Sequence, residues 1–459
     1  MKELTRRQFV KTAGMGAAVL LAAPRLALGT MRGPATGAER ASQLLPGSGQ
    51  FVVHTDLHNH SLISGDAFGD PETAYAQMRA RGIDAACVTE HAISGKGHGE
   101  LTCPGHEQGG CHTIEGINGT DWETMRELAD AAYAPDEFVS FRGFEWSTPT
   151  VGHLNVWFSE QFTDALHEFA FFTPTAIAEV DRVAPVPSNI VDLAAKLPEL
   201  ATMKFFYKWL ASSPDRELLG GGNDGIACFN HPNEFGSFEH FAYHAGAAPR
   251  IVSIEALNQE RDFFWFGLDH DPVKPNPLNA CLNAGWRVGV TGVSDEHSTE
   301  YGRAGMARGG LWVSELTRDG IRAALEARRS FATFEPGLRL DALANGAPMG
   351  TEQAHTTGVV HVTLDFDAGP EWIGRDIVVE VIRPGSEVPT LAGVLDVAVP
   401  GPSDAPISFD VEADIDDGDW MFLRITDPSK PPDELATEPF RSHGGALAYA
   451  SPWFFTPGA

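Results

Sequence analysis

The chain has 459 residues and a formal net charge of −29, from 33 Lys+Arg against 62 Asp+Glu. This acidity argues against nucleic acid as a stable partner, because nucleic-acid binders carry basic surfaces that replace counterions. It also matches an anionic membrane surface poorly. A small anionic substrate stays possible, because a bound cation reverses the local field. Charged residues make up 21% and hydrophobic residues 43% of the chain, which is typical of a globular protein.

The first segment, residues 1–29, resembles a twin-arginine export signal. Arg6 and Arg7 precede a short apolar run over 13–23, and Ala-Leu-Gly at 27–29 offers a small-residue cleavage site. We therefore expect a periplasmic or secreted protein. No later stretch has about 18 consecutive apolar residues, so we expect no membrane partner after cleavage. An uncleaved membrane anchor is the alternative.

Four of the five cysteines have an informative context. Cys87 and Cys228 lie in apolar runs, which predicts that both are buried. Cys103 and Cys111 flank a Pro/Gly-rich loop. In an oxidising compartment this spacing favours a disulfide, and a small zinc site with a neighbouring histidine is the alternative.

After a linker over 30–50, short β-rich runs alternate with helical segments, which predicts an α/β barrel or a doubly wound sheet. The predicted strands are 51–57, 85–89, 138–144, 154–158, 226–229, 251–256, 287–293 and 310–313, and the predicted helices include 71–81, 121–134 and 318–328. Residues 160–222 form a long, Phe-rich insertion, which either packs on this domain or covers a site as a lid.

The pattern changes near residue 340. The runs 359–366, 377–382, 407–411 and 420–425 alternate apolar and polar residues between Pro, Gly and Asp turns. This alternation is typical of antiparallel strands with one solvated face. We predict a main domain over 51–340, a small β-sandwich-like module over 341–440, and an aromatic segment over 441–459 that packs on the main domain.

Histidines and acids gather where predicted strands end. His58 and His60 follow the first strand two residues apart, so their side chains share one face and can hold one ion. The carboxyl ends of barrel strands converge on one rim, so we expect the whole set to be neighbours. The set comprises Asp56, His58, His60, Asp66, Glu90, His91, Glu145, His153, His231, Asp295 and His297. It exceeds the needs of one tetrahedral zinc, which predicts two or three divalent ions, Zn²⁺, Mn²⁺ or Fe²⁺.

Each of these residues alone has an ordinary interpretation, as a polar residue at a strand end or a cap. Their joint pattern resembles the polymerase-and-histidinol-phosphatase (PHP) superfamily of metal-dependent phosphoesterases, and within it the exported branch known as DUF3604. The resemblance spans residues 54–335 and is carried by the segments 56–61, 66–67, 89–91, 144–146, 152–155, 230–233 and 294–297. It implies a distorted (β/α)7 TIM-like barrel with up to three metals on its rim.

The resemblance also implies how the ligands divide. The first metal would be held by His58, His60, Glu145 and Asp295, the second by Glu145, His153 and His231, and the third by Asp66, His91 and His297. Glu145 would bridge the first two metals. Asp66 stands where other superfamily members have His, and an oxygen ligand there favours Mn²⁺ or Fe²⁺ over zinc.

The implied reaction is hydrolysis of a small phosphorylated substrate by water that two metals activate. Glu90 and Asp56 are candidates for proton transfer or for orienting a ligand histidine. Arg142 and Arg303 are candidates for phosphate contact, by position alone. Two other functions stay open. One is metal-dependent hydrolysis of non-phosphate esters, lactones or amides, and the other is non-catalytic binding of metal or a surface. The sequence does not indicate an oligomeric state.

Overall fold

The computed structural model describes most of the chain beyond its N-terminal segment. The described residues are 40–93, 116–148, 151–165, 203–216, 220–266, 276–354, 357–386, 388–414 and 419–456. The predicted export signal, the loop with Cys103 and Cys111, and most of the predicted insertion lie outside them. Residues Thr36–Ala459 form one unit by their internal contacts.

The strand β1 (Phe51–Asp56) lies inside the main sheet and has neighbours on both sides. It runs parallel to β2 (Ala85–Val88) and antiparallel to β9 (Arg308–Val313). Side chains on both of its faces are buried, which is the pattern of a strand covered on both sides. Cys87 in β2 and Cys228 are buried free thiols, as predicted.

The sheet continues from β2 through strands of both directions. The parallel pairs are β2 with β3 (Val139–Thr148), β5 (Ile226–Asn230) with β6 (Ile251–Asn258), and β6 with β8 (Gly289–Val293). The strand β4 (Gly152–Trp157) runs antiparallel to both β3 and β5, and the two-residue strand β7 (Arg261–Asp262) folds back on β6.

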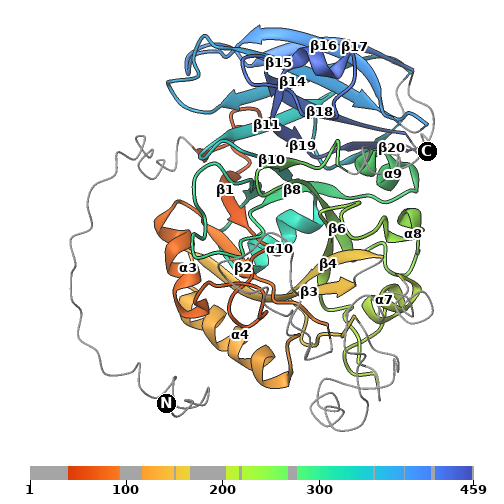
Figure 1. Ribbon diagram of the computed structural model, residues 1–459. Helices are drawn as coiled ribbons and strands as arrows, with labels where there is room; N and C mark the ends of the chain where they lie inside the picture. The colour runs from red at the N-terminus through yellow and green to blue at the C-terminus, as the bar shows by residue number, and fades with distance from the viewer. Residues whose placement is uncertain are drawn as a thin grey trace, which may run out of the picture. The chain divides into compact units, whose positions relative to one another are not determined.

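Helices follow several strands and begin at recognisable caps. Asp70 accepts from the amide of Glu72 at the start of α3 (Pro71–Ala80), and Asn118 forms a capping box at the start of α4 (Gly119–Ala132). Figure 1 shows α3 and α4 side by side on one flank of the strands. The helix α10 (Arg318–Glu326) begins after the cap Thr317. All three helices match predicted segments within two residues at each end.

The mixed α/β class is confirmed, but the closed (β/α)7 barrel is not. The pairs β9 with β1, β3 with β4 and β4 with β5 are antiparallel, and in the described part of the chain no ladder joins β8 to β9, so the sheet is open. The two strands still lie against one another. A Cβ atom added to Gly292 in β8 would be 2.5 Å from the backbone oxygen of Arg308 in β9, so the glycine allows an approach that a side chain would prevent.

The C-terminal region is built of antiparallel strands. The strand β10 (Ser330–Thr333) pairs with β9 and with β19 (Gly445–Ala450), which extends the main sheet. Beyond β19 follow β18 (Trp420–Asp427), β15 (Asp376–Arg383) and β16 (Thr390–Ala398). A second sheet holds β11 (Arg339–Ala344), β12 (Ala347–Pro348), β14 (Thr357–Asp367) and β17 (Ile407–Asp414). The strands β13 (Glu352–Ala354) and β20 (Trp453–Thr456) pair in parallel.

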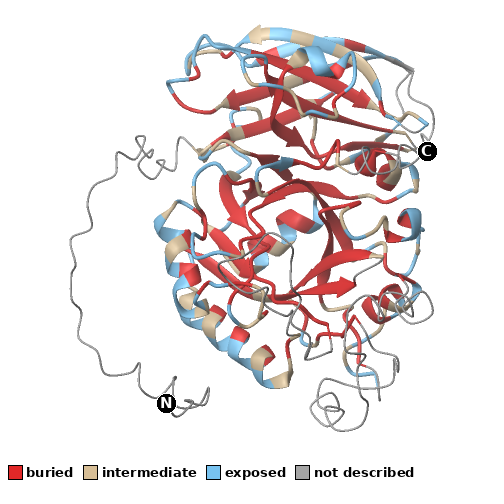
Figure 2. Ribbon diagram, viewed as in Figure 1, coloured by how far each residue is buried: buried red, intermediate tan, exposed pale blue. Residues whose placement is uncertain are grey.

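Apolar side chains from these two sheets form one core cluster, and those around the first strands form others. Figure 2 shows the strands from β1 to β6 buried along nearly their whole length. The described part of the predicted insertion includes α7 (Met203–Leu210), whose Phe206 stacks on Trp146 of β3 at 4.8 Å between ring centroids. The remaining short helices are α8 (Phe238–Phe241), α9 (Pro277–Asn283) and η2 (Phe440–His443). No helix of the described chain is long and apolar enough to cross a membrane.

Candidate metal centre

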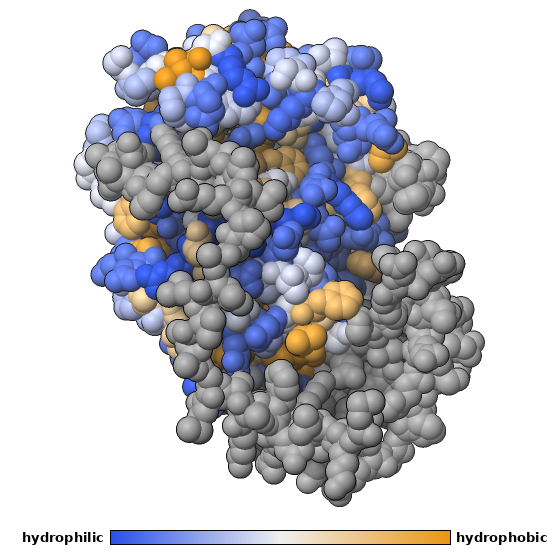
Figure 3. Space-filling view, turned by 60° about the vertical axis from the view of Figure 1, so that its left-hand side comes forward, coloured by the Kyte–Doolittle hydropathy of each residue, from blue (hydrophilic) through white to orange (hydrophobic). Residues whose placement is uncertain are grey.

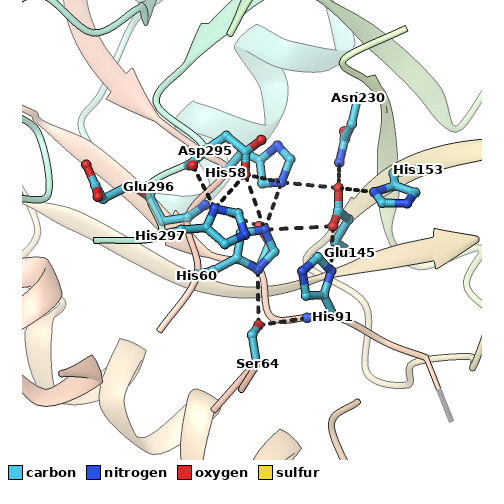
Figure 4. A network of polar contacts seen from close by, with 12 residues as sticks. His58, His60, Ser64, His91, Glu145, His153, Asn230, Asp295, Glu296 and His297 are labelled. Carbon is cyan, nitrogen blue, oxygen red and sulfur yellow. Dashed lines mark hydrogen bonds and ion pairs between the residues drawn. The ribbon is translucent and has the colours of Figure 1, made fainter. Parts of the chain in front are cut away.

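The predicted ligands come from six strands and the turns that follow them. His58 and His60 follow β1, His91 follows β2, and Asp295 and His297 follow β8. Isolated bridges tie these turns together, Asn59 to Glu296 and His91 to Glu145. Glu145 and His153 lie within β3 and β4, and His231 comes directly after β5. The structure therefore brings the nine predicted ligands to one place, shown in part in Figure 4.

Glu145 lies at the middle of this cluster and is fully buried. Its Oε1 is 3.2 Å from His58 Nε2 and 3.1 Å from His231 Nε2, and its Oε2 is 2.8 Å from His91 Nδ1. Asn230 donates to Oε1 at 2.8 Å and the Ser147 hydroxyl donates to Oε2 at 2.9 Å. These two donors hold the carboxylate so that both oxygens face imidazole nitrogens.

The first predicted ligand group has the spacing of atoms around one ion. His58 Nε2 is 3.1 Å from His60 Nε2, and each of these nitrogens is 3.4 Å from Asp295 Oδ1. The distance from His60 Nε2 to Glu145 Oε2 is 3.7 Å. Ligand atoms about 2.0–2.2 Å from a tetrahedral ion are separated by about 3.3–3.6 Å. The donor atoms of His58, His60 and Glu145 lie close enough together to share a divalent cation, and Asp295 Oδ1 lies beside both histidines.

The second predicted group, Glu145, His153 and His231, is also compact. His153 Nδ1 lies 3.2 Å and His231 Nε2 lies 3.1 Å from the same oxygen, Glu145 Oε1. All three donor atoms lie within 4.8 Å of one another. Because Oε1 also faces His58, one carboxylate oxygen serves two neighbouring groups of ligands, as a bridging ligand must.

The third predicted group lies at the outer side of the cluster. Asp66 Oδ2 is 3.0 Å from His91 Nε2 and 3.5 Å from His297 Nε2. His60, His91 and His297 also meet the distance criterion for a shared ion. The His297 side chain is 34% exposed, against at most 9% for the ligands of the first group, so this side of the centre is the one open to solvent.

The carboxylates give the cluster a negative potential. Burial opposes the charged form, but the charge of Asp66 and its hydrogen bond outweigh burial and raise the pKa of His91 to about 10. The same competition raises the pKa of His297 to about 9 through Asp66 and Asp295. Burial and the neighbouring imidazoles lower the pKa of His60 to about 3. The same negative potential that favours protonated histidines here would attract a divalent cation, and a bound cation would displace those protons.

Two buried polar atoms of the cluster without hydrogen-bond partners indicate whether its residues fit a metal. Asp295 Oδ1 and His153 Nδ1 are buried and have no hydrogen-bond partner in the described chain. Such atoms are costly unless something satisfies them. Both belong to predicted ligand groups and face the other donors, so a cation satisfies both at once. The donor set of imidazoles and carboxylates fits a borderline divalent ion.

A second layer orients the ligands. Glu255 in β6 is fully buried, and its Oε1 lies 2.8 Å from His58 Nδ1, while its Oε2 accepts from the amide of His231 at 2.7 Å. This carboxylate fixes which His58 nitrogen points at the centre. Glu255 was not among the predicted site residues. What marks it in the sequence is that it is an acid within a mostly apolar strand, Ile251–Asn258.

Glu90 and Asp56 also belong to this outer layer. The Glu90 carboxylate accepts from the hydroxyls of Ser61 and Ser64, and Ser64 Oγ lies 3.1 Å from His60 Nδ1. Asp56 accepts from the amide and hydroxyl of Ser294, directly before Asp295, at 3.0 and 2.6 Å. Of the two proposed roles, orientation is the one that these contacts support, because in the described part of the chain neither carboxylate forms a hydrogen bond or ion pair with a ligand side chain.

The two predicted phosphate-contact residues have other partners. Arg142 lies over the Trp122 ring at 3.9 Å and donates to the backbone oxygen of Glu160 at 3.1 Å. Arg303 pairs with Glu260 at 3.2 Å. Neither arginine is among the contacts of the ligand cluster, so the structure does not bring them to the site. For Arg142 the reason is alternation along β3, which points position 142 and position 145 to opposite faces.

Comparisons with known proteins give no family model and no curated protein that matches the chain. Among solved structures, the chain is similar to a two-domain protein from Bacteroides vulgatus that contains a predicted PHP-like metal-dependent phosphoesterase. The TM-score is 0.36 at 15% identity, over 88% of this chain and 96% of that one.

Two further solved structures are similar over shorter stretches. Histidinol phosphate phosphatase from Lactococcus lactis, in complex with zinc, L-histidinol and phosphate, has a TM-score of 0.25 at 13% identity, over 53% of this chain and 86% of that one. An amidohydrolase from Chromobacterium violaceum with bound sulfate has a TM-score of 0.25 at 15% identity, over 60% and 96%. At such low TM-scores these likenesses carry no assignment.

Proposed function

We propose that the chain is a metal-dependent hydrolase of the PHP type and that it acts on a phosphate ester. The observation that carries the proposal is the position of Glu145, whose two buried oxygens face five imidazoles from four different parts of the chain. A purely structural carboxylate needs one or two partners. One that faces five imidazoles suits a centre of two or three divalent ions, Zn²⁺, Mn²⁺ or Fe²⁺.

Such ions, when bound, supply Lewis acidity and lower the pKa of water toward neutrality. The protein's own residues provide the geometry. Glu255 holds His58 by its Nδ1, and Ser64 holds His60 by its Nδ1, so that both Nε2 atoms face the centre. In the proposed reaction, water bonds to phosphorus, the bond from phosphorus to the alcohol oxygen breaks, and that oxygen takes one proton from the water.

The remaining expectations stay part of the proposal. The (β/α)7 barrel of the PHP type would be present in a distorted, open form. Export by the twin-arginine route would place the enzyme in the periplasm or outside the cell, and its substrate would be a small phosphorylated molecule. The domain limits and the lid over 160–222 also stay predictions.

The non-catalytic alternative loses one support. If the surface it binds were a glycan, the β module predicted over 341–440 would need exposed aromatic side chains, and its two tryptophans are Trp372 and Trp420. Both are buried, at 3% and 1% exposure. Neither is therefore available as a platform for a sugar ring.

The experiment that tests the proposal combines metal content with turnover. The purified protein is expected to carry about two to three ions per chain by elemental analysis, and to hydrolyse phosphomonoesters. The variant His58→Ala with His60→Ala should lose metal and turnover but keep its far-UV circular dichroism. His361→Ala is the matched control, because His361 pairs with Asp410 on the surface of the C-terminal region.

Unchanged turnover in the double variant would contradict the proposal. A panel of sulfate esters, lactones and amides alongside the phosphate esters separates the alternatives. Turnover of a lactone or amide with no turnover of any phosphate ester would keep the metal centre and overturn the phosphoesterase assignment.

A further inference from the structure

Three exposed apolar residues stand close to predicted metal ligands in the sequence. Leu62 is 54% exposed, Phe68 52% and Phe235 44%. Each of the three stands two to four residues after a predicted ligand in the sequence. Figure 3 shows a face that is largely hydrophilic, with a few separate hydrophobic patches. A large apolar side chain that is exposed beside a polar site indicates a surface for binding.

Phe235 is the member of this group that contacts the ligands directly. Its ring stacks on His153 with 4.4 Å between centroids and an angle of 3°, and its edge meets His231 at 5.4 Å. One face of the ring therefore covers a predicted ligand. Since 44% of the residue is exposed, the remainder of the ring is open to a bound molecule beside the centre.

The backbone that carries Phe235 is strained. His231 and Asn233 have φ values of 20° and 74°, and the four residues Phe238–Phe241 all lie in the left-handed region. Side chains other than glycine adopt this region at a cost, and such strain is retained chiefly at functional sites. The Asn233 amide donates to the backbone oxygen of Gly236 at 3.0 Å, which closes the turn that brings Phe235 back over His153.

Positive side chains are scarce around this surface. In the described part of the chain, no lysine or arginine forms a hydrogen bond or ion pair with a predicted ligand. Arg261 pairs with Glu234 at 2.8 Å, and Glu234 in turn lies 3.5 Å from His231 Nδ1. The carboxylate therefore offsets that positive charge. A leaving group with further negative charges would find no free partner among these groups.

We infer that Phe235 forms the leaving-group side of the substrate site, and that the hydrolysed ester carries an aromatic alcohol whose ring stacks on Phe235. This inference rests on the proposed function. The phosphoryl group would lie at the ligand cluster, and the aromatic ring would lie on the open part of Phe235, in the offset or edge-to-face arrangement that aromatic pairs prefer.

The test compares benzyl phosphate with ethyl phosphate, because their alcohols have similar acidity and differ in the ring. The wild-type enzyme should have the higher kcat/KM for benzyl phosphate. In Phe235→Ala the ratio of the two kcat/KM values should fall by about three- to tenfold, the range expected for loss of one aromatic pair. Cyclohexylmethyl phosphate shows whether the ring must be aromatic.

Two controls separate this inference from other effects. Tyr243→Ala removes a ring that is 51% exposed and packs on Trp286, away from the ligands, and should leave the ratio unchanged. Metal content of Phe235→Ala is measured by elemental analysis. A ratio unchanged in Phe235→Ala, or a loss of metal that accounts for the fall in turnover, overturns the inference. Absence of turnover with both esters in the wild type overturns the proposed function instead.

Discussion

His58 Nδ1 and Glu255 Oε1 lie 2.8 Å apart, both fully buried, on the side of the imidazole that faces away from the ligand cluster. A buried carboxylate in this position keeps a proton on Nδ1 and leaves the electron pair of Nε2 available to bind a cation. Glu255, which is not itself a predicted ligand, thus orients His58 for binding a cation.

Glu255→Gln should therefore weaken metal binding more than folding. The amide keeps the size of the side chain but loses the charge that favours the required His58 tautomer, and changes of this kind cost about 10- to 100-fold in metal affinity. Competition with a chromophoric chelator measures the affinity. Glu300→Gln is the control, since Glu300 pairs with Arg303 on the surface. Equal affinity in the two variants would show that Glu255 does not act through His58.

Removal of metal should lower thermal stability. Without a cation, the carboxylates of Glu145 and Asp295 are buried among imidazoles, and the oxygen Asp295 Oδ1 lacks a hydrogen-bond partner. A ligand at 100 times its dissociation constant stabilises the folded state by about 2.7 kcal/mol. We expect a chelator to lower Tm by several degrees and excess Mn²⁺ or Zn²⁺ to restore it, as measured by differential scanning fluorimetry. The variant His58→Ala with His60→Ala should show no such response.

Gly292→Ala should disturb both stability and the site. The new Cβ would meet the Arg308 backbone oxygen at 2.5 Å, so β8 must move from β9, and Asp295 follows β8 directly. Overpacking of this kind costs about 1–3 kcal/mol. Urea unfolding and metal content measure the two effects. Gly393→Ala is the control, because its Cβ would approach its nearest neighbours only to 3.4 Å. Equal unfolding midpoints for the two variants would refute the proposed close approach.

Asp84 should make the folding stability depend on pH, and a substitution at this position can isolate its contribution. Burial raises the pKa of Asp84, against the opposing charge of Arg40 and the amide of His54. The folded state therefore binds the Asp84 proton more tightly than the unfolded state. Its contribution to stability is present at pH values below the unfolded pKa and is lost as pH rises through the folded one.

The stability of the wild type relative to Asp84→Asn should accordingly fall as pH rises above about 4, the usual aspartate pKa. The comparison cancels effects of metal loss that both proteins share. Urea unfolding at a series of pH values measures the difference. A difference that rises with pH would mean that the ion pair with Arg40, at 2.9 Å, dominates over burial.

The ligand cluster could be predicted from sequence because its residues have a distinctive context. His58 and His60 share a face directly after a strand, and Asp295 and His297 repeat that arrangement after another. Glu255 could not be found in this way. An acid within a mostly apolar strand does not indicate which residue it contacts, and the histidine that Glu255 orients, His58, lies 197 residues away.

The open sheet and the positions of the two arginines could not be predicted from the sequence. In a strand that is buried on both faces, the residue pattern does not show whether its neighbours run parallel or antiparallel. The sequence therefore predicts a barrel, whereas β4 runs antiparallel to both of its partners. Arg142 lies in a predicted strand near Glu145, but proximity in sequence does not fix the face. The stacking of Arg142 on Trp122 depends on α4, whose position is decided by tertiary packing.

The pairing of Phe51 with Val313 has a consequence for how the protein is made. One side of β1 stays without its partner until β9 has been synthesised, and β10 in turn needs β19 near the end of the chain. Contacts so distant in sequence form slowly and late. The main sheet is therefore expected to become complete only after nearly the whole chain has been synthesised, so an unfinished chain exposes apolar strands that the finished protein buries.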